Sequence, residues 1–336
     1  MLLEKLSNLP GVSGDEGAVR EAIVEELQGL HLEWRTDTMG NLLVRKEGGA
    51  PPARRVMLAA HMDEVGLMVV AIEKSGHLKF KTVGGIDSRV LLSKRVLLGP
   101  DKIPGVIGAK AIHLQKAEER RKPLEIDQLY LDMGATNREE AEKYLAIGDY
   151  GSFDTKCTAF GDGCFRGKAF DDRAGCAVLL ELLREKNGLT FDAAFTVQEE
   201  VGLRGARVAA YSLRPQLALA VEATAAADTP DTAAERSATA LGKGPAVSFM
   251  DRSLIADRAI LQGLLTAAEG AGIPFQLRRT TAGGTDAGAI ALSREGVKAG
   301  VVAVPCRYIH SPCGVLKESD LQHTAALVRA WLEAIA

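Results

Sequence analysis

The stretch Arg55–Gly66, RVMLAAHMDEVG, sets an apolar run directly against polar residues. Its first half, RVMLAA, predicts a β-strand. His61 and Asp63 follow at the point where this strand runs out. Because α/β sheets bind ligands at the carboxyl ends of their strands, the stretch predicts both an α/β fold and a site at that edge of the sheet.

The same pattern recurs along some 250 positions of the chain. Glu199 and Glu200 follow AAFTVQ, Glu222 follows LALAV, His310 comes shortly after VVAVP, and Asp171 lies between a Gly-rich loop and a helix. One aspartate, two histidines and two of these three glutamates would suffice for two divalent metals that share a bridging carboxylate. The remaining glutamate would be free as a general base. We therefore interpret the chain as a two-metal hydrolase.

Two of these motifs have a specific chemical reading and a plainer alternative. In AAHMDEVG, His61 could bind a metal through one ring nitrogen while Asp63 accepts a hydrogen bond from the other nitrogen, which fixes the tautomer. The alternative is a capped strand end with a satisfied histidine. In GKAFDDRAG, the adjacent carboxylates of Asp171 and Asp172 repel each other unless a cation or helix amides absorb the charge. The alternative is an ordinary N-terminal cap.

Two further motifs also allow two interpretations. Glu199 and Glu200 end a buried-looking strand, where two unpaired anions are unfavourable; metal binding would neutralise one and leave the other as a base. The alternative is a solvated strand end. The motif TTAGGTDAG contributes four candidate substrate-binding residues: Gly283, Gly284, Thr285 and Asp286. Their backbone amides could cradle a substrate carbonyl or oxyanion, or could form a plain helix cap.

The composition of the chain is typical of a soluble enzyme and disfavours nucleic acid and membranes as partners. The 336 residues are 46% hydrophobic and 25% charged, which are ordinary globular values and allow one large domain plus a smaller one. A net charge of -3 gives no basic footprint for nucleic acid. The amino terminus lacks the apolar core of a signal peptide, and no window is apolar enough to span a membrane, so we expect a cytoplasmic location. The five cysteines form no CxxC pair, which disfavours thiolate zinc sites and a disulfide framework.

The texture of the chain changes between residues 67 and 163, where short β-type runs are punctuated by glycine and proline. This pattern predicts a small all-β module, a partly closed barrel or sandwich, with one helix at 137–145. The α/β pattern then resumes, so the main domain would be discontinuous, built from 1–66 and 164–336. Residues 225–245 contain few large apolar groups and predict a mobile loop beside the site.

Helix and strand signals complete the outline of the main domain. Ser13-Gly-Asp-Glu16 is a capping-box pattern for a helix over 13–29. DDRAGCAVLLELLRE (171–185) predicts an amphipathic helix, and Ser319 predicts the cap of the last helix. NLLVRK (41–46) and RVMLAA (55–60) predict strands separated by the loop GGAPPA.

Taken together, the motifs AHMDEVG, FDDR, QEEVG, E-x-T-x-A-x-D, GGTDAG and RYIHSP resemble, in order, those of the tetrahedral (TET-type) dinuclear-metal aminopeptidases. This cytoplasmic family includes glutamyl, leucyl and lysyl aminopeptidases. The resemblance spans nearly the whole chain. It implies a zinc-peptidase-like mixed sheet flanked by helices, interrupted by a small β-rich domain that mediates dimer contacts. The family builds dimers and often twelve-subunit shells, so a homo-oligomer is expected.

The resemblance also implies a role for each candidate residue. One metal would be held by His61, Asp171 and Glu222, and the other by Asp171, Glu200 and His310, so that Asp171 bridges. Glu199 becomes the general base, Asp63 supports His61, and the Asp171–Asp172 peptide bond is expected to be cis. Two metals roughly 3.5 to 4 Å apart would lower the pKa of a shared water and polarise the scissile carbonyl. Nitrogen and oxygen ligands suit Zn, Co or Mn.

The expected function is removal of N-terminal residues from peptides, and several other functions are alternatives to it. Several relatives have Asp where this chain has Glu222, and the longer side chain alters the pocket for a free amine. A carboxypeptidase or another two-metal amidohydrolase is therefore an alternative function. Some relatives have been labelled endoglucanases, but a glycoside hydrolase needs no histidine ligands and usually has aromatic sugar platforms; only 5% of residues here are aromatic. In a noncatalytic metal-binding or scaffold protein, Glu199 would have no purpose.

Overall fold

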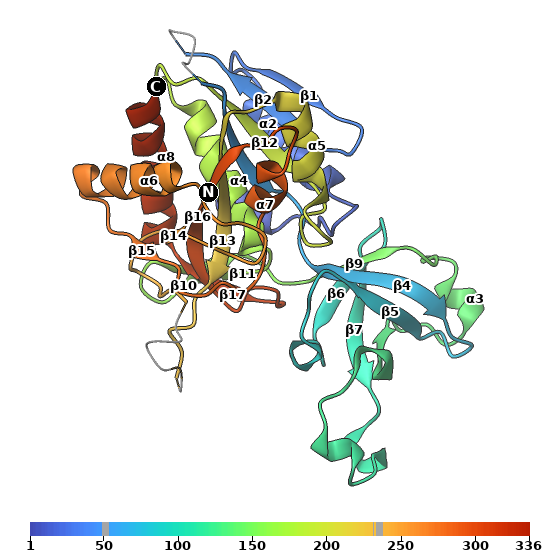
Figure 1. Cartoon of the computed structure of the whole chain (residues 1–336). Helices are drawn as coiled ribbons and strands as arrows, with labels where there is room; N and C mark the ends of the chain where they lie inside the picture. The colour runs from blue at the N-terminus through green and yellow to red at the C-terminus, as the bar shows by residue number, and fades with distance from the viewer. Residues whose placement is uncertain (49–53, 231, 233–237) are drawn as a thin grey trace.

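A computed structural model of the chain describes residues 1–48, 54–230, 232 and 238–336. Residues 49–53 of the predicted GGAPPA loop, and 231 and 233–237 of the predicted loop at 225–245, lie outside the described residues. Figure 1 shows a large lobe, in which helices cover a central sheet, and a smaller lobe built of strands β4 to β9. Within the described residues, no helix is both long enough and apolar enough to cross a bilayer.

The large lobe is built on an 11-stranded sheet of described residues. Its main path runs β1-β2-β12-β3-β13-β16-β17-β11-β10, and β14 and β15 extend it beside β16. The strands are β1 (Glu33–Thr36), β2 (Leu42–Lys46), β3 (Val56–His61), β10 (Thr158–Phe160), β11 (Cys164–Gly167), β12 (Phe191–Thr196), β13 (Leu217–Ala225), β14 (Ala246–Ser248), β15 (Gln276–Leu277), β16 (Lys298–Arg307) and β17 (Gly314–Lys317). Neighbours among β12, β3, β13 and β16 pair in parallel, so their carboxyl ends meet at one edge of the sheet.

Helices cover both faces of this sheet. They are α1 (Leu2–Ser7), α2 (Gly17–Leu27), α4 (Phe170–Arg184), α5 (Arg204–Leu213), α6 (Arg258–Ala271), α7 (Asp286–Ala291) and α8 (Glu318–Ile335). Strand β3 is buried throughout because its alternate side chains serve two cores. Val56, Leu58 and Ala60 join the core with α1, α2, α4, α6 and α8, whereas Met57 and Ala59 join the core under α5 and α7. This confirms the expected α/β fold with a mixed sheet between helices.

The smaller lobe is a closed barrel with the strand order β4-β5-β8-β7-β6-β9. Its elements are β4 (Gly66–Ile72), β5 (Leu78–Val83), β6 (Arg95–Leu98), β7 (Ile103–Ala109), β8 (Leu129–Asp132), β9 (Tyr150–Phe153), α3 (Arg138–Ala141) and the short 3-10 turns η1 (Ser88–Val90), η2 (Ile112–Leu114), η3 (Glu119–Arg121) and η4 (Ile126–Gln128). A separate hydrophobic core that includes Leu67, Leu78 and Phe153 fills it. Because the barrel is closed, each of its strands has a neighbour on both sides and no strand edge is left open.

Three local expectations differ from the structure. The sequence boundary at residue 163 falls after β10, but β10 pairs with β11 and thus adds to the large sheet, so the last barrel strand ends at Phe153. The first long helix begins at Gly17 rather than at 13, because the Ser13 hydroxyl donates to Asp63 instead of capping. The last helix begins at Glu318 with Lys317 as its N-cap residue, so Ser319 already lies within the first turn.

Candidate metal centre

The parallel strands bring most of the candidate ligands to one edge of the sheet. His61 is the last residue of β3, while Glu199 and Glu200 follow β12 and His310 follows β16. Glu222 differs from the expectation, because β13 continues to Ala225 and Glu222 therefore lies inside the strand. The longer pairing of β13 with β16 accounts for this difference. The side chain of Glu222 is buried beside α7, where its Oε1 accepts a hydrogen bond from the backbone of Asp286 at 2.9 Å.

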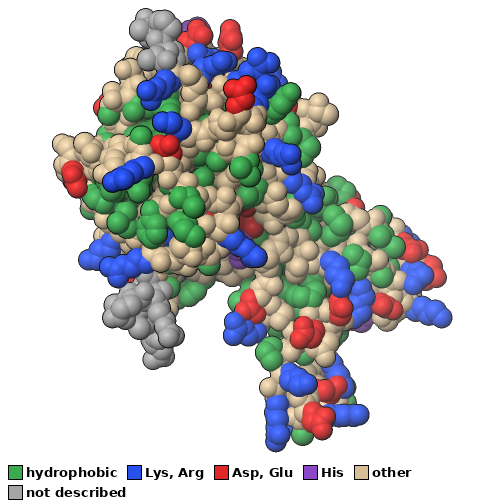
Figure 2. Space-filling view, in the orientation of Figure 1, with side chains coloured by type: hydrophobic (Ala, Val, Ile, Leu, Met, Phe, Trp, Pro, Cys, Tyr) green, Lys and Arg blue, Asp and Glu red, His purple; other side chains and the backbone are tan. Residues whose placement is uncertain are grey.

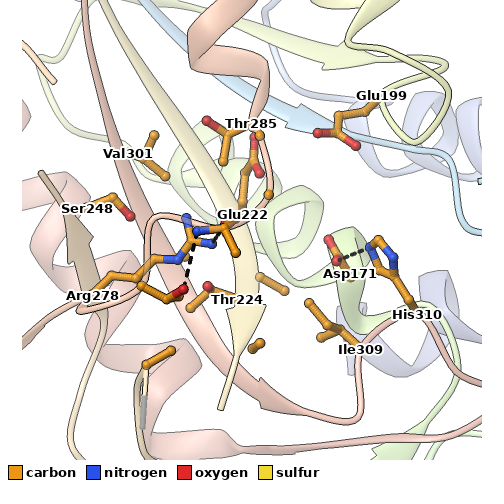
Figure 3. A pocket seen from close by; sticks show the side chains of 18 of the residues that line it. Asp171, Glu199, Glu222, Thr224, Ser248, Arg278, Thr285, Val301, Ile309 and His310 are labelled. Atoms are coloured by element: carbon orange, nitrogen blue, oxygen red, sulfur yellow. Dashed lines mark hydrogen bonds and ion pairs between the residues drawn. The ribbon is translucent and has the colours of Figure 1, made fainter. Parts of the chain in front are cut away.

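Asp171 lies at the start of α4 and faces both histidines. The peptide bond between Asp171 and Asp172 is cis, as the resemblance implies, and both residues have non-helical backbone angles. One carboxylate oxygen of Asp171 lies 3.2 Å from Nε2 of His61, and the other lies 3.4 Å from Nε2 of His310. Figure 3 shows the contact between Asp171 and His310. Each oxygen thus faces a different imidazole, which is the arrangement that a carboxylate bridging two cations requires.

The donor atoms form two overlapping groups that fit divalent cations. His61, Asp171 and Glu200 offer atoms within 4.8 Å of one another, and so do His61, Glu199 and Glu222. Glu200 also lies 3.3 Å from Nε2 of His310. The donors are imidazole nitrogens and carboxylate oxygens, a set that suits Zn, Co and Mn. Glu199, the base in the resemblance, lies in the second group, close to both His61 and Glu222.

Carboxyl groups outnumber imidazoles in this cluster, and their burial and mutual repulsion shift their pKa values. Burial, together with the negative charge of Asp171, raises the pKa of Glu200 to about 7. Burial also raises the pKa values of Glu199 and Glu222 well above their ordinary range. Burial acts in the opposite direction on His310, but Asp171 and Glu200 raise its pKa to about 9. Burial opposes ionisation of Asp171, but His310 and His61 lower its pKa, whereas the three glutamates beside it resist ionising. Two divalent cations would neutralise the negative charge of this cluster.

Asp63 organises the loop that carries the two glutamates. It is fully buried, and its carboxylate accepts backbone hydrogen bonds from Glu199 at 3.0 Å and Glu200 at 3.1 Å. The Ser13 hydroxyl donates to the same carboxylate at 2.6 Å. Nδ1 of His61 lies 3.1 Å from the Asp63 carbonyl and 3.4 Å from its carboxylate. Asp63 therefore positions both His61 and the loop of Glu199 and Glu200.

His310 is oriented from the barrel side. Its Nδ1 lies 2.9 Å from the carbonyl oxygen of Gly85, in the loop that follows β5. This contact leaves Nε2 to face Asp171 and Glu200. The adjacent Gly84 has φ 81°, and a Cβ atom there would come within 2.8 Å of Val65 and 3.3 Å of Glu200. No pattern in the sequence indicates this contribution of the barrel.

A cavity of about 720 Å³ opens onto the cluster and extends away from it toward β14 and β15. Gly283, Gly284 and Thr285 line this cavity, whereas Asp286 lies behind its wall. The amide of Asp286 donates to Glu222, and its carboxylate accepts a hydrogen bond from the Thr196 hydroxyl. The Thr285 amide is likewise engaged, by Ser253. Two of the four predicted amides are thus committed within the protein, and Asp286 supports Glu222 instead of facing the cavity.

Three polar residues on the far wall of the cavity were given no role from the sequence. Thr224, Ser248 and Arg278 line it, from β13, β14 and the residue directly after β15. Figure 3 shows Ser248 and Arg278 on the opposite side of Glu222 from His310. The polar run LRRTT before the GGTD motif was the available signal for Arg278. Ser248 is an ordinary strand residue in the sequence, and Thr224 lies in the motif E-x-T-x-A-x-D without a role of its own.

A mixed α/β sheet with imidazoles and carboxylates at its carboxyl edge, interrupted by a barrel that supplies a contact to one imidazole, defines a metallopeptidase of aminopeptidase type. The chain belongs to the M42 glutamyl aminopeptidase family, whose model matches residues 40–327. This confirms the family suggested by the motifs.

Individual relatives match over almost the full chain. The lysyl aminopeptidase of Pyrococcus furiosus is 34% identical over 342 residues, which cover 99% of this chain and 96% of that protein. A TET aminopeptidase from a marine sediment archaeon of the Thaumarchaeota has a TM-score of 0.94 at 35% identity and covers 100% of this chain and 98% of that one. The TET1 peptidase of Pyrococcus horikoshii, which can assemble into a tetrahedron or a large octahedral shell, has a TM-score of 0.86 at 33% identity, with 98% and 97% covered.

Proposed function

We propose that the protein is a two-metal aminopeptidase that removes N-terminal residues from peptides with Glu199 as general base. The observation that carries this proposal is the position of Asp171 between His61 and His310, one carboxylate oxygen toward each ring. His61, Asp171 and Glu222 would hold one metal, and Asp171, Glu200 and His310 the other. When bound, two such cations supply Lewis acidity toward a carbonyl oxygen and lower the pKa of water.

The remaining chemistry falls to side chains of the chain. Glu199 is not one of the proposed ligands, and burial, together with the neighbouring carboxylates of Glu222 and Asp286, raises the pKa of its carboxyl, which favours acceptance of a proton. It would accept a proton from the attacking water and pass it to the leaving amine. Asp63, through the Glu199 amide, fixes the loop from which this carboxylate acts.

The cavity also favours a peptide over a polysaccharide. Its described lining contains carboxylates beside which a free α-ammonium group would be held, and this favours exopeptidase action. It contains no Trp, Tyr or Phe among the described residues, so the aromatic platform usual for sugars is missing there. We infer that the substrates are unfolded peptides, that nucleic acids and membranes are not partners, and that the enzyme works in the cytoplasm.

Metal content tests the proposal directly. Protein stripped with a chelator, reloaded with Zn, Co or Mn and passed through a desalting column should retain about two equivalents per chain by elemental analysis. Aminoacyl p-nitroanilide turnover should return with the metal and show which ion serves best. An active enzyme with no bound metal would disprove the two-metal mechanism.

We further propose that the chain divides into a discontinuous catalytic domain and an inserted domain that mediates subunit contact; the inserted domain was expected at 67–163, and its last barrel strand ends at Phe153. The support comes from an arm between β7 and β8, residues 110–128, which extends from the barrel in Figure 1. Ile112 and Leu114 on this arm are 69% and 63% exposed. Figure 2 shows charged side chains of both signs on this arm. Exposed apolar residues within a charged rim are typical of an interaction site, and we propose homo-oligomers based on dimers and extending to twelve subunits.

Substitutions on the arm should shrink the assembly and leave the metal centre intact. The double variant Ile112→Glu/Leu114→Glu places charges where apolar contacts are proposed, so light scattering should give a smaller mass with about two metals retained. The control is His113→Glu, which adds a charge on the same turn without removing an apolar side chain. Unchanged mass in the double variant would place the contacts elsewhere. Deleting the whole barrel is a poorer test, because it would also remove the Gly85 carbonyl that holds His310.

A further inference from the structure

Side-chain oxygens accept hydrogen bonds from four successive backbone amides in the loop that carries Glu199 and Glu200. The amides and their acceptors are Val197 with Asn41 at 3.0 Å, Gln198 with Glu16 at 3.1 Å, Glu199 with Asp63 at 3.0 Å and Glu200 with Asp63 at 3.1 Å. Asn41 directly precedes β2 and Glu16 directly precedes α2, so segments far apart in the sequence meet at this loop. The conformation of the loop therefore depends on groups outside it.

The backbone of Gln198 depends on such a contact in particular. Its φ of 55° lies in the left-handed region, which is unfavourable for a residue that carries a side chain. Gln198 directly precedes Glu199, so a change in its backbone angles would change the direction in which the Glu199 side chain points. Asp63 holds the amides of the next two residues, whereas the amide of Gln198 itself donates to Glu16.

The side chain of Glu16 does not serve the helix that follows it. Glu16 is the N-cap residue of α2, but its side chain makes no capping hydrogen bond. Its Oε1 accepts instead from the amides of Gly14 at 2.8 Å and Gln198 at 3.1 Å. Glu16 is only 5% exposed and forms no ion pair with a described residue, and a buried carboxylate without a counter-charge is costly. Helix capping therefore does not account for this residue.

We propose that Glu16 is a positioning residue of the aminopeptidase, which fixes through the amide of Gln198 the backbone from which Glu199 acts. This rests on the proposed function, in which Glu199 is the general base. Ser13 acts on the same loop through Asp63. Neither Ser13 nor Glu16 lines the cavity, so the segment 13–16 supports the catalytic loop from behind, without contact with the substrate.

The contact with Gln198 requires a hydrogen-bond acceptor rather than a charge. Burial raises the pKa of Glu16, and the negative charge of Asp63 adds to this effect, whereas the Gly14 amide opposes it. A neutral amide oxygen in the same place can accept both hydrogen bonds, so Glu16→Gln should preserve the loop. Glu16→Asp should not, because it withdraws the acceptor by one methylene group. Since Asp is a favourable N-cap residue, α2 should remain stable in Glu16→Asp.

The test measures kcat and KM for an aminoacyl p-nitroanilide on the metal-loaded variants, together with their thermal unfolding. Glu16→Ala and Glu16→Asp should each lower kcat by about 10- to 100-fold, the cost typical of an outer-shell partner, while KM changes far less. Glu16→Gln should keep most of the activity.

The matched control is Asp257→Ala. Asp257 also accepts two backbone amides, those of Ala259 and Ile260, but it does so at the start of α6, and its own amide donates to Ala299 near the amino end of β16. Asp257→Ala should therefore lower the thermal stability without lowering kcat. An equal loss of kcat in Asp257→Ala and Glu16→Ala would reduce the role of Glu16 to general stability.

A double-mutant cycle tests whether Glu16 acts through the general base. In the Glu199→Gln background, Glu16→Ala should have little further effect on kcat, because two changes that act through one group are not additive. A further loss as large as that in the parent background would show that Glu16 acts on another group. Parent-level kcat in both Glu16→Ala and Glu16→Asp, or a loss that Glu16→Gln shares, would also overturn the inference.

Amide hydrogen exchange separates this inference from the proposed function, because it requires no turnover. Peptides that span 197–203 should exchange faster in Glu16→Ala than in the parent and in Glu16→Gln, while peptides from α6 should not. Unchanged exchange at this loop would refute the inference even in an active aminopeptidase. Faster exchange, in a protein whose parent form cleaves no peptide, would support the contact between Glu16 and the loop and refute the proposed function instead.

Discussion

Glu199→Gln should lower kcat by on the order of 100-fold or more while the protein still binds two metals, since general-base catalysis typically contributes at least that factor. The amide is nearly isosteric with the carboxylate but cannot accept a proton. The loop should keep its position, because Asp63 holds it through the backbone amides of Glu199 and Glu200 rather than through their side chains. Steady-state kinetics, elemental analysis and thermal unfolding of the same preparation check the three parts of this prediction.

Glu199→Asp is the matched control for that variant. It keeps a carboxylate but draws it back by one methylene group, so its activity should fall between those of the parent and Glu199→Gln. Parent-level turnover in Glu199→Gln would remove this residue from the proton transfer. Loss of one metal equivalent would show instead that Glu199 is a metal ligand. This is the main alternative role for Glu199, because it lies close to His61 and Glu222.

Asp171→Asn should have the larger effect on metal content, because both of its carboxylate oxygens are used. One lies near His61 and the other near His310, so the amide would weaken both metals at once. We expect the stoichiometry to fall toward zero and kcat to fall by about 1,000-fold or more, beyond the 10- to 100-fold cost typical of outer-shell partners.

Glu200→Gln provides the comparison that makes this prediction specific. Glu200 lies near His310 on one side of the cluster, so its amide should weaken one metal and leave close to one equivalent bound. Titration of the stripped variants with Co, followed by visible absorption, would resolve the two sites. If Asp171→Asn retains one tight site, as Glu200→Gln should, Asp171 does not bridge.

The sequence predicted those parts of the fold that depend on local patterns. RVMLAA forms β3 because its small and apolar side chains suit both cores, and the glycine-punctuated segment after it closes into a barrel. His61 and Glu199 were recognisable because a polar residue at the end of a buried apolar run is costly without a partner. Tertiary contacts explain the failures. Ser13 looked like a helix cap, but the buried carboxylate of Asp63 takes its hydroxyl.

Arg278 was beyond sequence reasoning for a related reason. An Arg-Arg pair after a short strand does not show which side chain turns inward, and only the packing of β14 and β15 beside β16 points Arg278 toward the cavity. Glu222 was found, but its place within β13 depends on how far the pairing with β16 extends. The number of residues over which two strands pair depends on both strands, so it cannot be deduced from the sequence of one strand alone.

The carbonyl of Gly85 has a consequence for how such enzymes can diverge. A barrel that only joined subunits could be exchanged for another of similar size without any effect on the catalytic site. Here one peptide group of the insert orients His310, and the glycine before it leaves room for Glu200. The residues on the outer surface of the barrel can change during evolution and so allow new subunit assemblies. The two-glycine loop after β5, in contrast, must be conserved together with the catalytic lobe.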